Sequence, residues 1–132
     1  MEIGSIFLSG VITIQVVTLN VWGLPNFFFK DLSPNRNGRI AAICKTLHQE
    51  IKKPKGWDVV LIQEAGVKDN RDQLKSCGFK HSIDLEDDSL AIDSGLMILS
   101  RYPLDPESID RHRYSVGGAF TKALSDGEYL VN

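Results

Sequence analysis

The sequence predicts an α/β fold in which helices pack on one sheet, and three observations support this class. Residues 13–21 and 58–63 are nearly continuous in apolar character and rich in β-branched side chains, which is typical of buried strands. An amphipathic segment lies between them, and a short polar segment and a third apolar segment follow. Strands that alternate with helices in this way form a sheet covered by helices, and the sheet need not be all parallel.

The composition fits one compact domain whose surface is not tuned to polyanions. The chain has 132 residues, of which 42% are hydrophobic and 24% are charged. It contains no internal repeat or linker that would indicate two domains. The formal net charge is -2 and the pI is near 5.9. Because nucleic-acid-binding domains are usually basic, nucleic acid is not favoured as a partner.

The first part of the chain predicts a strand, a loop and a helix. Residues 13–21 form the expected strand, the segment 22–25 (WGLP) ends it, and a loop follows over 26–34. We expect Asn35 or Asn37 to cap the helix. The apolar residues after this cap have the three- and four-residue spacing of one buried helix face: Ile40, Ile43, Cys44, Leu47 and Ile51.

The rest of the chain predicts further strands around a second helix. The strand over 58–63 (DVVLIQ) ends at Glu64, and a short polar helix is expected over 69–77, stopped by Gly78. Further strands are expected over 79–83, over 95–100 (GLMILS) and, with weaker alternation, over 109–116. The tail over 117–132 has turn signals, and we expect no finishing element in it.

The cysteines and the N-terminal residues bear on the compartment. Cys44 and Cys77 have neither metal-ligand nor disulfide-framework spacing, so we expect both to be reduced core or boundary residues. The start of the chain lacks a basic region and carries Glu2, which argues against a signal peptide. No apolar run is long enough to span a bilayer. We therefore expect a soluble protein, cytoplasmic or peripheral to a membrane, with the compartment itself left open.

Two polar side chains end the first two predicted strands. Asn20 lies near the end of the first strand, and Glu64 lies just past the end of the second. Polar groups at the carboxyl ends of neighbouring strands meet at one edge of a sheet, where ligand sites of α/β folds form. Oxygen ligands of this kind suit Mg²⁺ or Mn²⁺. The alternatives are that Glu64 marks a solvated strand end and that Asn20 is a turn residue.

Three ordered segments resemble a known family. They are TLNVWGLP at 18–25, DVVLIQE at 58–64 and SGLMILSRYPL at 94–104, with a predicted helix after the first. In this order they are similar to the endonuclease/exonuclease/phosphatase superfamily, which includes deoxyribonucleases, inositol polyphosphate phosphatases and sphingomyelinases. The WGLP tetrapeptide directly after the Asn20 segment looks most like neutral and bacterial sphingomyelinases.

The resemblance implies a fold and roles for the two polar residues. It implies that the chain, over 1–132, is the N-terminal half of a four-layered α/β sandwich, with one mixed sheet and its packed helices. Glu64 would hold a catalytic Mg²⁺, and Asn20 would orient the metal, water or phosphate. The acid and base residues of this family lie downstream of the matched region. His48, His81 and His112 are instead expected on the surface, so we expect negligible activity from this fragment.

The resemblance also implies the substrate class and leaves rivals open. The best match is a magnesium-dependent phosphodiesterase acting on sphingomyelin or a similar phospholipid head group; the rivals are a nuclease and an inositol polyphosphate phosphatase. A non-catalytic binding module is a further alternative, with the aromatic side chains of Phe27, Phe28 and Phe29 contacting a membrane or partner. Half of a sandwich would expose an apolar sheet face, so we expect self-association or a missing C-terminal half.

Overall fold

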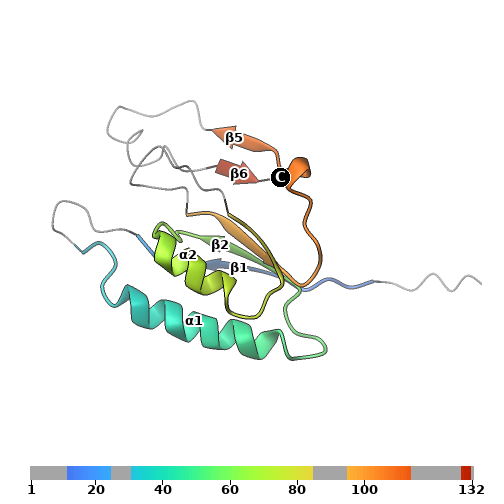
Figure 1. Cartoon of the computed structure of the whole chain (residues 1–132), viewed down its shortest axis with the longest axis horizontal. Coiled ribbons are helices and arrows are strands. Elements are labelled where there is room, and N and C mark those ends of the chain that lie inside the picture. The colour runs from blue at the N-terminus through green and yellow to red at the C-terminus, as the bar shows by residue number, and fades with distance from the viewer. Residues whose placement is uncertain (1–11, 25–30, 85–94, 114–128, 132) are drawn as a thin grey trace, which may run out of the picture.

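The computed structural model describes residues 12–24, 31–84, 95–113 and 129–131 (Figure 1). Within these ranges the chain forms two α-helices, one 3₁₀ helix and six strands. In chain order they are β1 (Val16–Asn20), α1 (Arg36–Glu50), β2 (Val59–Gln63), α2 (Lys68–Lys75), β3 (His81–Asp84), β4 (Met97–Ser100), η1 (Pro106–Ser108), β5 (Arg111–Arg113) and β6 (Tyr129–Val131).

One four-stranded mixed sheet forms the centre of the molecule, which confirms the predicted class. Its strand order is β1-β2-β4-β3. β1 and β2 are parallel, whereas β2 with β4 and β3 with β4 are antiparallel. In the parallel pair, Asn20 lies opposite Gln63. The two strands therefore end at the same edge, and Glu64 is the next residue after that edge.

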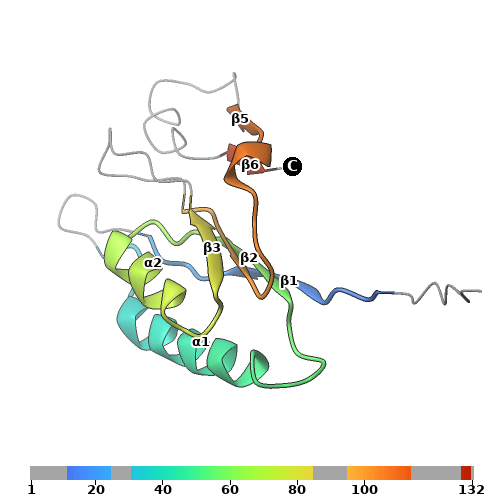
Figure 2. The same ribbon diagram turned by 45° about the vertical axis from the view of Figure 1, so that its right-hand side comes forward.

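Both helices cover one face of this sheet (Figures 1 and 2). Alternate residues of the central strands point toward them and are buried, as the pleat of a strand requires. On average, burying such a side chain contributes about 1.5–3 kcal/mol, so this layer supplies most of the apolar core. Its fully buried aliphatic members include Val60, Ile62 and Leu99 from the sheet, with Ile40, Leu47 and Leu74 from the helices.

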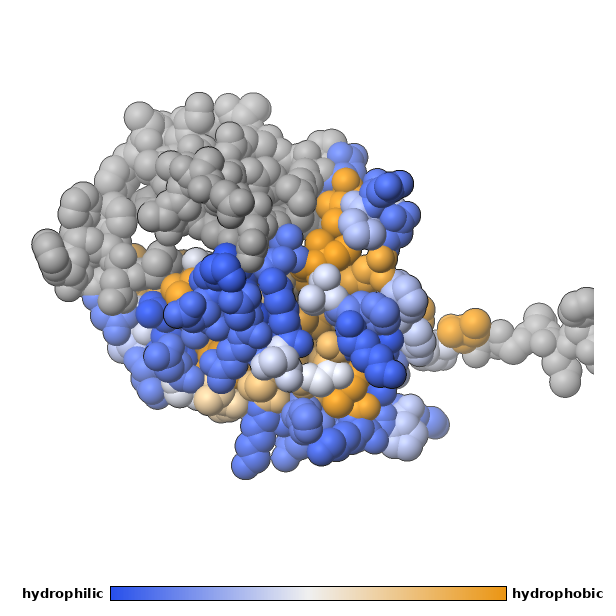
Figure 3. Space-filling model, in the orientation of Figure 1, coloured by the Kyte–Doolittle hydropathy of each residue, from blue (hydrophilic) through white to orange (hydrophobic). Residues whose placement is uncertain are grey.

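The opposite face of the sheet is only partly covered. The antiparallel pair β5–β6 lies on this side, away from the helices (Figures 1 and 2). Val16 is 60% exposed and Leu61 is 37% exposed, and both belong to the set of residues that points away from α1. Figure 3 shows apolar surface between the helical layer and the segment that leads to β5. The open part of this second face thus includes apolar side chains.

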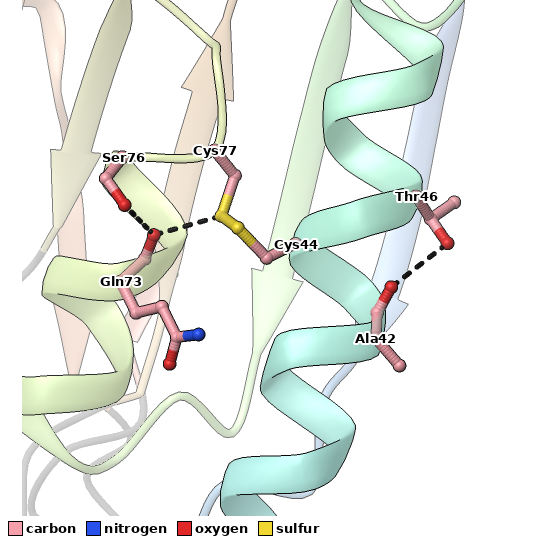
Figure 4. The surroundings of a disulfide bond; sticks show 6 residues. All are labelled: Ala42, Cys44, Thr46, Gln73, Ser76 and Cys77. Atoms are coloured by element: carbon pink, nitrogen blue, oxygen red, sulfur yellow. Dashed lines mark hydrogen bonds between the residues drawn. A yellow bond between two sulfur atoms is a disulfide. The ribbon is translucent and has the colours of Figure 1, made fainter.

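Cys44 and Cys77 form a disulfide, which corrects the expectation that both are reduced (Figure 4). Cys44 lies on α1 and Cys77 follows α2, with their Cα atoms 5.2 Å apart. The sequence separation is 33 residues, and the two cysteines meet only because α1 and α2 pack side by side on the sheet. Spacing along the chain carries no information on that packing.

Several predicted boundaries need correction. The tail was expected to lack a finishing element, but β6 pairs with β5 there. The strand predicted over 79–83 begins later, at His81, and the strand predicted over 13–21 is shorter than expected. The strand predicted over 109–116 begins at Arg111, and its last three positions lie outside the described residues. Asn35 precedes α1, yet its side chain makes no capping hydrogen bond because its backbone is left-handed, with φ at 56°. The aromatic residues at 27–29 lie outside the described residues.

Candidate metal centre

The structure brings Asn20 and Glu64 into direct contact. The Asn20 Nδ2 group donates a hydrogen bond to Glu64 Oε1 across 2.7 Å. The contact follows from the parallel register of β1 and β2, since both residues stand at the carboxyl edge of that strand pair. Asn20 is exposed and Glu64 is half-buried. A carboxylate and an amide from separate strands therefore meet at a solvent-accessible edge of the sheet.

The hydrogen bonds of Asn20 fix which way its amide points. The Asn20 Oδ1 atom accepts a hydrogen bond from the Trp22 backbone N–H at 2.8 Å. Because an N–H group can only donate, the amide oxygen faces Trp22 and the amide nitrogen faces Glu64. Among the described residues, the Glu64 carboxylate has no second hydrogen-bond donor. Its remaining lone pairs are available for a cation or water.

The backbone at Glu64 adopts an unusual conformation. Glu64 has φ at 58°, in the left-handed region that non-glycine residues rarely occupy. Two hydrogen bonds hold it there: the Gly23 N–H donates to Glu64 O at 2.7 Å, and the Ala65 N–H donates to Gly95 O at 2.8 Å. Such backbone strain persists only where the surrounding structure enforces it, and it is concentrated at functional sites.

Two glycines allow the chain to approach Glu64 this closely. A Cβ on Gly23 would lie 2.7 Å from the Glu64 carbonyl oxygen. A Cβ on Gly95, whose φ is 65°, would lie 2.9 Å from the Ala65 nitrogen and 3.0 Å from the Glu64 Cα. Glycine at the end of a strand often marks such a close backbone approach. Neither position tolerates a side chain without moving Glu64.

The loop after β1 is held against the first turns of α1. Trp22 also has a left-handed backbone, with φ at 46°. Its carbonyl accepts hydrogen bonds from Arg39 Nη2, at 2.8 Å, and from the Ser33 hydroxyl. The Arg39 guanidinium stacks 4.8 Å from the centre of the Trp22 ring, and Arg36 donates to the Leu24 carbonyl at 2.6 Å. The Trp22 ring stays 48% exposed beside the Asn20 segment.

The histidines do not join this edge in the described part of the chain. His48 is exposed on α1 and lies near Gly78, after the end of α2. His81 begins β3 and lies opposite Ser100, which in turn pairs with the first residue of β2. It therefore belongs to the other end of the sheet. The backbone of His112 is in β5, and the structure does not describe its side chain.

The donor set is small but suits a hard cation. Over the described ranges, no group of three or more His, Cys, Asp or Glu side chains is arranged to hold a metal. Mg²⁺ commonly binds through one or two carboxylates, with waters and substrate phosphate completing its shell. Glu64 with Asn20 matches that minimal protein contribution, and Asn20 contributes chiefly as a donor that orients the carboxylate.

Sequence reasoning missed three residues that support Glu64. Gly23 and Gly95 are two of them, and their positions just outside apolar strands were a readable signal of close backbone approach. The third is Arg71, whose Nη1 donates to the carbonyl of Ala65 at 2.9 Å. No signal in the sequence identifies it, because a short polar helix reveals nothing about which of its charged residues is buried.

Comparison with known proteins identifies the family. The model of the Endonuclease/Exonuclease/phosphatase family matches residues 17–126, a range that includes both Asn20 and Glu64. The search of curated proteins found no match. Among solved structures, the chain is similar to a β-hairpin deletion mutant of β toxin from Staphylococcus aureus, with 21% sequence identity and a TM-score of 0.48. The alignment covers 69% of this chain and 36% of the toxin chain. On the strength of the family match, the chain belongs to the endonuclease/exonuclease/phosphatase family.

Proposed function

We propose that this chain supplies the metal-binding edge of a magnesium-dependent phosphoric ester hydrolase. The observation that carries the proposal is the hydrogen bond from Asn20 to Glu64 at the shared end of β1 and β2. Family membership supports hydrolysis at a coarse level. The proposal adds the metal, the ligand and the role of each residue, with Mn²⁺ as an alternative ion.

In this proposal Glu64 is the carboxylate ligand and Asn20 is the residue that orients it. A bound Mg²⁺ would neutralise negative charge on the phosphoryl oxygens and the leaving group. Asn20 keeps Glu64 Oε1 in one direction, and the hydrogen bonds from Gly23 and to Gly95 keep the backbone of Glu64 from relaxing. The chain thereby presents a preorganised oxygen ligand and avoids reorganisation when the metal binds.

A general base is expected from outside the described residues. Losing such a base costs a factor of about 10²–10⁴ in rate, and neither His48 nor His81 lies near Glu64 in the described structure. The chain covers 36% of the solved relative's length, and the family resemblance implies an Asp–His pair further along. Metal binding is accordingly the property of this chain that can be tested directly.

Calorimetric titration with Mg²⁺ tests the proposal. The Glu64→Gln variant keeps the shape of the side chain but removes its charge, so we expect at least a tenfold loss of Mg²⁺ affinity. Glu107→Gln, on the exposed helix η1, is the matched control and should bind Mg²⁺ as the unchanged chain does. Equal affinity for the unchanged chain and Glu64→Gln, with both folded by circular dichroism, would refute the assignment.

The substrate we favour is a phosphodiester of the sphingomyelin type. Support comes from the WGLP segment, in which the Trp22 backbone N–H bonds Asn20, the Trp22 side chain is exposed, and Gly23 contacts Glu64. Assaying the protein that carries this chain on sphingomyelin, abasic DNA and inositol polyphosphates separates the candidates. Release of phosphocholine, with no cleavage of the other two, is the expected outcome; preferential cleavage of DNA or inositol phosphates would assign the substrate to a rival class.

The disulfide favours an oxidising compartment over the cytoplasm. Disulfides persist in secreted and periplasmic proteins, whereas cytosolic thiols are kept reduced. Neither described helix has the length and apolar character that crossing a bilayer requires. Thiol labelling of the native protein from its own cells, followed by mass spectrometry, should find Cys44 and Cys77 blocked. Quantitative labelling of both would place the protein in a reducing compartment.

A further inference from the structure

Arg71 is a charged residue of α2 whose side chain is buried, and the proposed metal site does not yet account for it. It is only 4% exposed, although arginine is almost never fully buried without a partner. Its Nη1 atom donates a hydrogen bond to the carbonyl oxygen of Ala65 at 2.9 Å. Ala65 is itself fully buried and directly follows Glu64. The guanidinium therefore holds the second peptide unit after the proposed metal ligand, between Ala65 and Gly66.

A second contact fixes the position of Arg71. Its Nε atom lies 3.6 Å from the carboxylate of Asp84 on β3, and Lys75 lies 2.6 Å from the same carboxylate. The Asp84 side chain is 16% exposed, so Arg71 and Asp84 both lie largely out of solvent. Arg71 thus joins three separate elements: α2, β3 and the segment after β2.

Burying the Arg71 charge costs free energy unless the charge is paired and hydrogen-bonded. A well-packed apolar residue in place of a buried ion pair is often neutral or even stabilising, so core stability alone does not call for an arginine here. The Ala65 carbonyl, by contrast, needs a donor, because a buried unsatisfied carbonyl costs about 1–3 kcal/mol. The requirement for a donor at this position comes from the segment that carries Glu64.

The support around Glu64 comes from three directions. Gly23 donates to the Glu64 carbonyl from the loop after β1, and Gly95 accepts from the Ala65 N–H just before β4. Both of these contacts lie within the layer of the sheet. The Arg71 contact comes from the helical layer, and it restricts the third side of the segment. The Arg71 bond holds the next peptide unit, between Ala65 and Gly66, which neither of the other two bonds restrains.

We infer that Arg71 is a positioning residue for Glu64, acting through the Ala65 carbonyl to hold the ligand in its left-handed conformation. The inference rests on the proposed metal site and adds a residue to it. Residues that orient a metal ligand without touching the metal typically change metal affinity by 10–100-fold when they are replaced. Arg71 should behave in this way because it bonds the carbonyl of the residue after Glu64.

Titration with Mn²⁺, followed by the electron paramagnetic resonance signal of the free ion, tests this inference on the full chain. Arg71→Met should weaken Mn²⁺ binding about 10–100-fold. Arg71→Lys keeps one donor but loses the forked geometry, so it should restore part of the affinity. Lys68→Met, an exposed position on the same helix, is the control and should bind Mn²⁺ like the unchanged chain.

The outcomes separate this inference from the proposed function. If Glu64→Gln loses Mn²⁺ affinity while folded Arg71→Met and Arg71→Lys both bind normally, the metal site stands and the role of Arg71 is overturned. If Glu64→Gln binds normally, the proposed function itself fails. Should Arg71→Met not fold, Arg71→Lys decides: weakened binding, together with a changed ¹³C shift of the Ala65 carbonyl, supports the role, and wild-type binding overturns it.

Discussion

The two ends of strand β2 are built in opposite ways. At the amino end, Arg101 donates hydrogen bonds to four backbone carbonyls and lies 3.4 Å from the carboxylate of Asp58. Those carbonyls belong to the end of α1 and the turn after it, namely Glu50, Ile51, Lys53 and Trp57. At the carboxyl end, Glu64 has a left-handed backbone and a carboxylate with one donor among the described residues.

This difference separates a stabilising end from a functional one. The last carbonyls of a helix have no partner within the helix. Backbone N–H groups of the turn and Arg101 together supply donors at the end of α1, so that end has little spare hydrogen-bonding capacity. At the other end, strain and an incompletely satisfied carboxylate persist because the surrounding loops enforce them, which is typical of functional sites. Changes at the amino end should therefore reduce stability and spare metal binding, whereas changes near Glu64 should reduce both.

Removing the disulfide should have the largest effect on stability, and it tests whether the helical layer can be weakened without affecting the metal site. The Cys44→Ser/Cys77→Ser double variant releases a bond that closes a 33-residue separation. We expect a loss of about 2–4 kcal/mol in the free energy of unfolding, measured in urea. Mg²⁺ affinity of the folded variant should be unchanged; a weaker affinity would mean that the disulfide is needed to keep Arg71 of α2 in contact with the Ala65 carbonyl.

Arg101→Met should have the next largest effect on stability, and it tests the amino end of β2. The variant removes the Arg101 donor from the Ile51 and Trp57 carbonyls, for a loss of about 2–3 kcal/mol. The Glu50 and Lys53 carbonyls keep backbone donors. Urea unfolding measures this, with the exposed Lys55→Met as control. Under conditions where the variant is folded, Mg²⁺ affinity should match that of the unchanged chain. A loss of Mg²⁺ affinity without a loss of stability would contradict the view that the amino end of β2 serves stability alone.

Gly95→Ala should lower the free energy of unfolding less than Arg101→Met does, and it should weaken metal binding more. The new Cβ would have to occupy a left-handed position within 3.0 Å of the Glu64 Cα, at a cost of about 1–3 kcal/mol. We expect weaker Mg²⁺ binding in calorimetry as well. Gly78→Ala is the matched control, since Gly78 also has positive φ, at 108°, but contacts Ile51 and His48 instead. If both variants weaken Mg²⁺ binding equally, the effect is not specific to Glu64.

The smallest effect is expected at Asp72, on the solvent side of α2. The hydrogen bond from Lys68 holds the pKa of the Asp72 carboxyl below its usual value. A lowered pKa means that this pair stabilises the fold above the normal pKa of aspartate, and that the contribution is lost as pH falls through the lowered value. Because the side chain is exposed and salt screens it, Asp72→Asn should leave the urea midpoint at pH 7 nearly unchanged.

The sequence predicted the site better than it predicted what supports the site. The apolar strands end where Asn20 and Glu64 stand, and the parallel order of strands after an intervening helix brings such ends together. The expectation that the two strands are neighbours therefore placed both residues at one edge, and the parallel pairing of β1 with β2 confirms this placement. The apolar character of 58–63 also predicted a buried strand, and Val60 and Ile62 of β2 are buried.

The support for Glu64 depends on tertiary packing that periodicity does not encode. Arg71 lies on a short polar helix and is buried only because α2 packs over the segment after β2. The Cys44–Cys77 bond depends in the same way on how α1 and α2 lie together. The role of Arg101 likewise follows from the end of α1 meeting the end of β4. These contacts join elements distant in sequence.

The most direct test of the account is whether a bound cation sits beside the Asn20 amide. In the ¹⁵N-labelled chain, substoichiometric Mn²⁺ should broaden the Asn20 side-chain NH₂ signals first, because this group donates to Glu64 Oε1 at 2.7 Å. The broadening should disappear in Glu64→Gln. Mn²⁺ that broadens signals around Asp72 or Asp84 while leaving the Asn20 amide sharp would contradict the assignment of the metal to this edge.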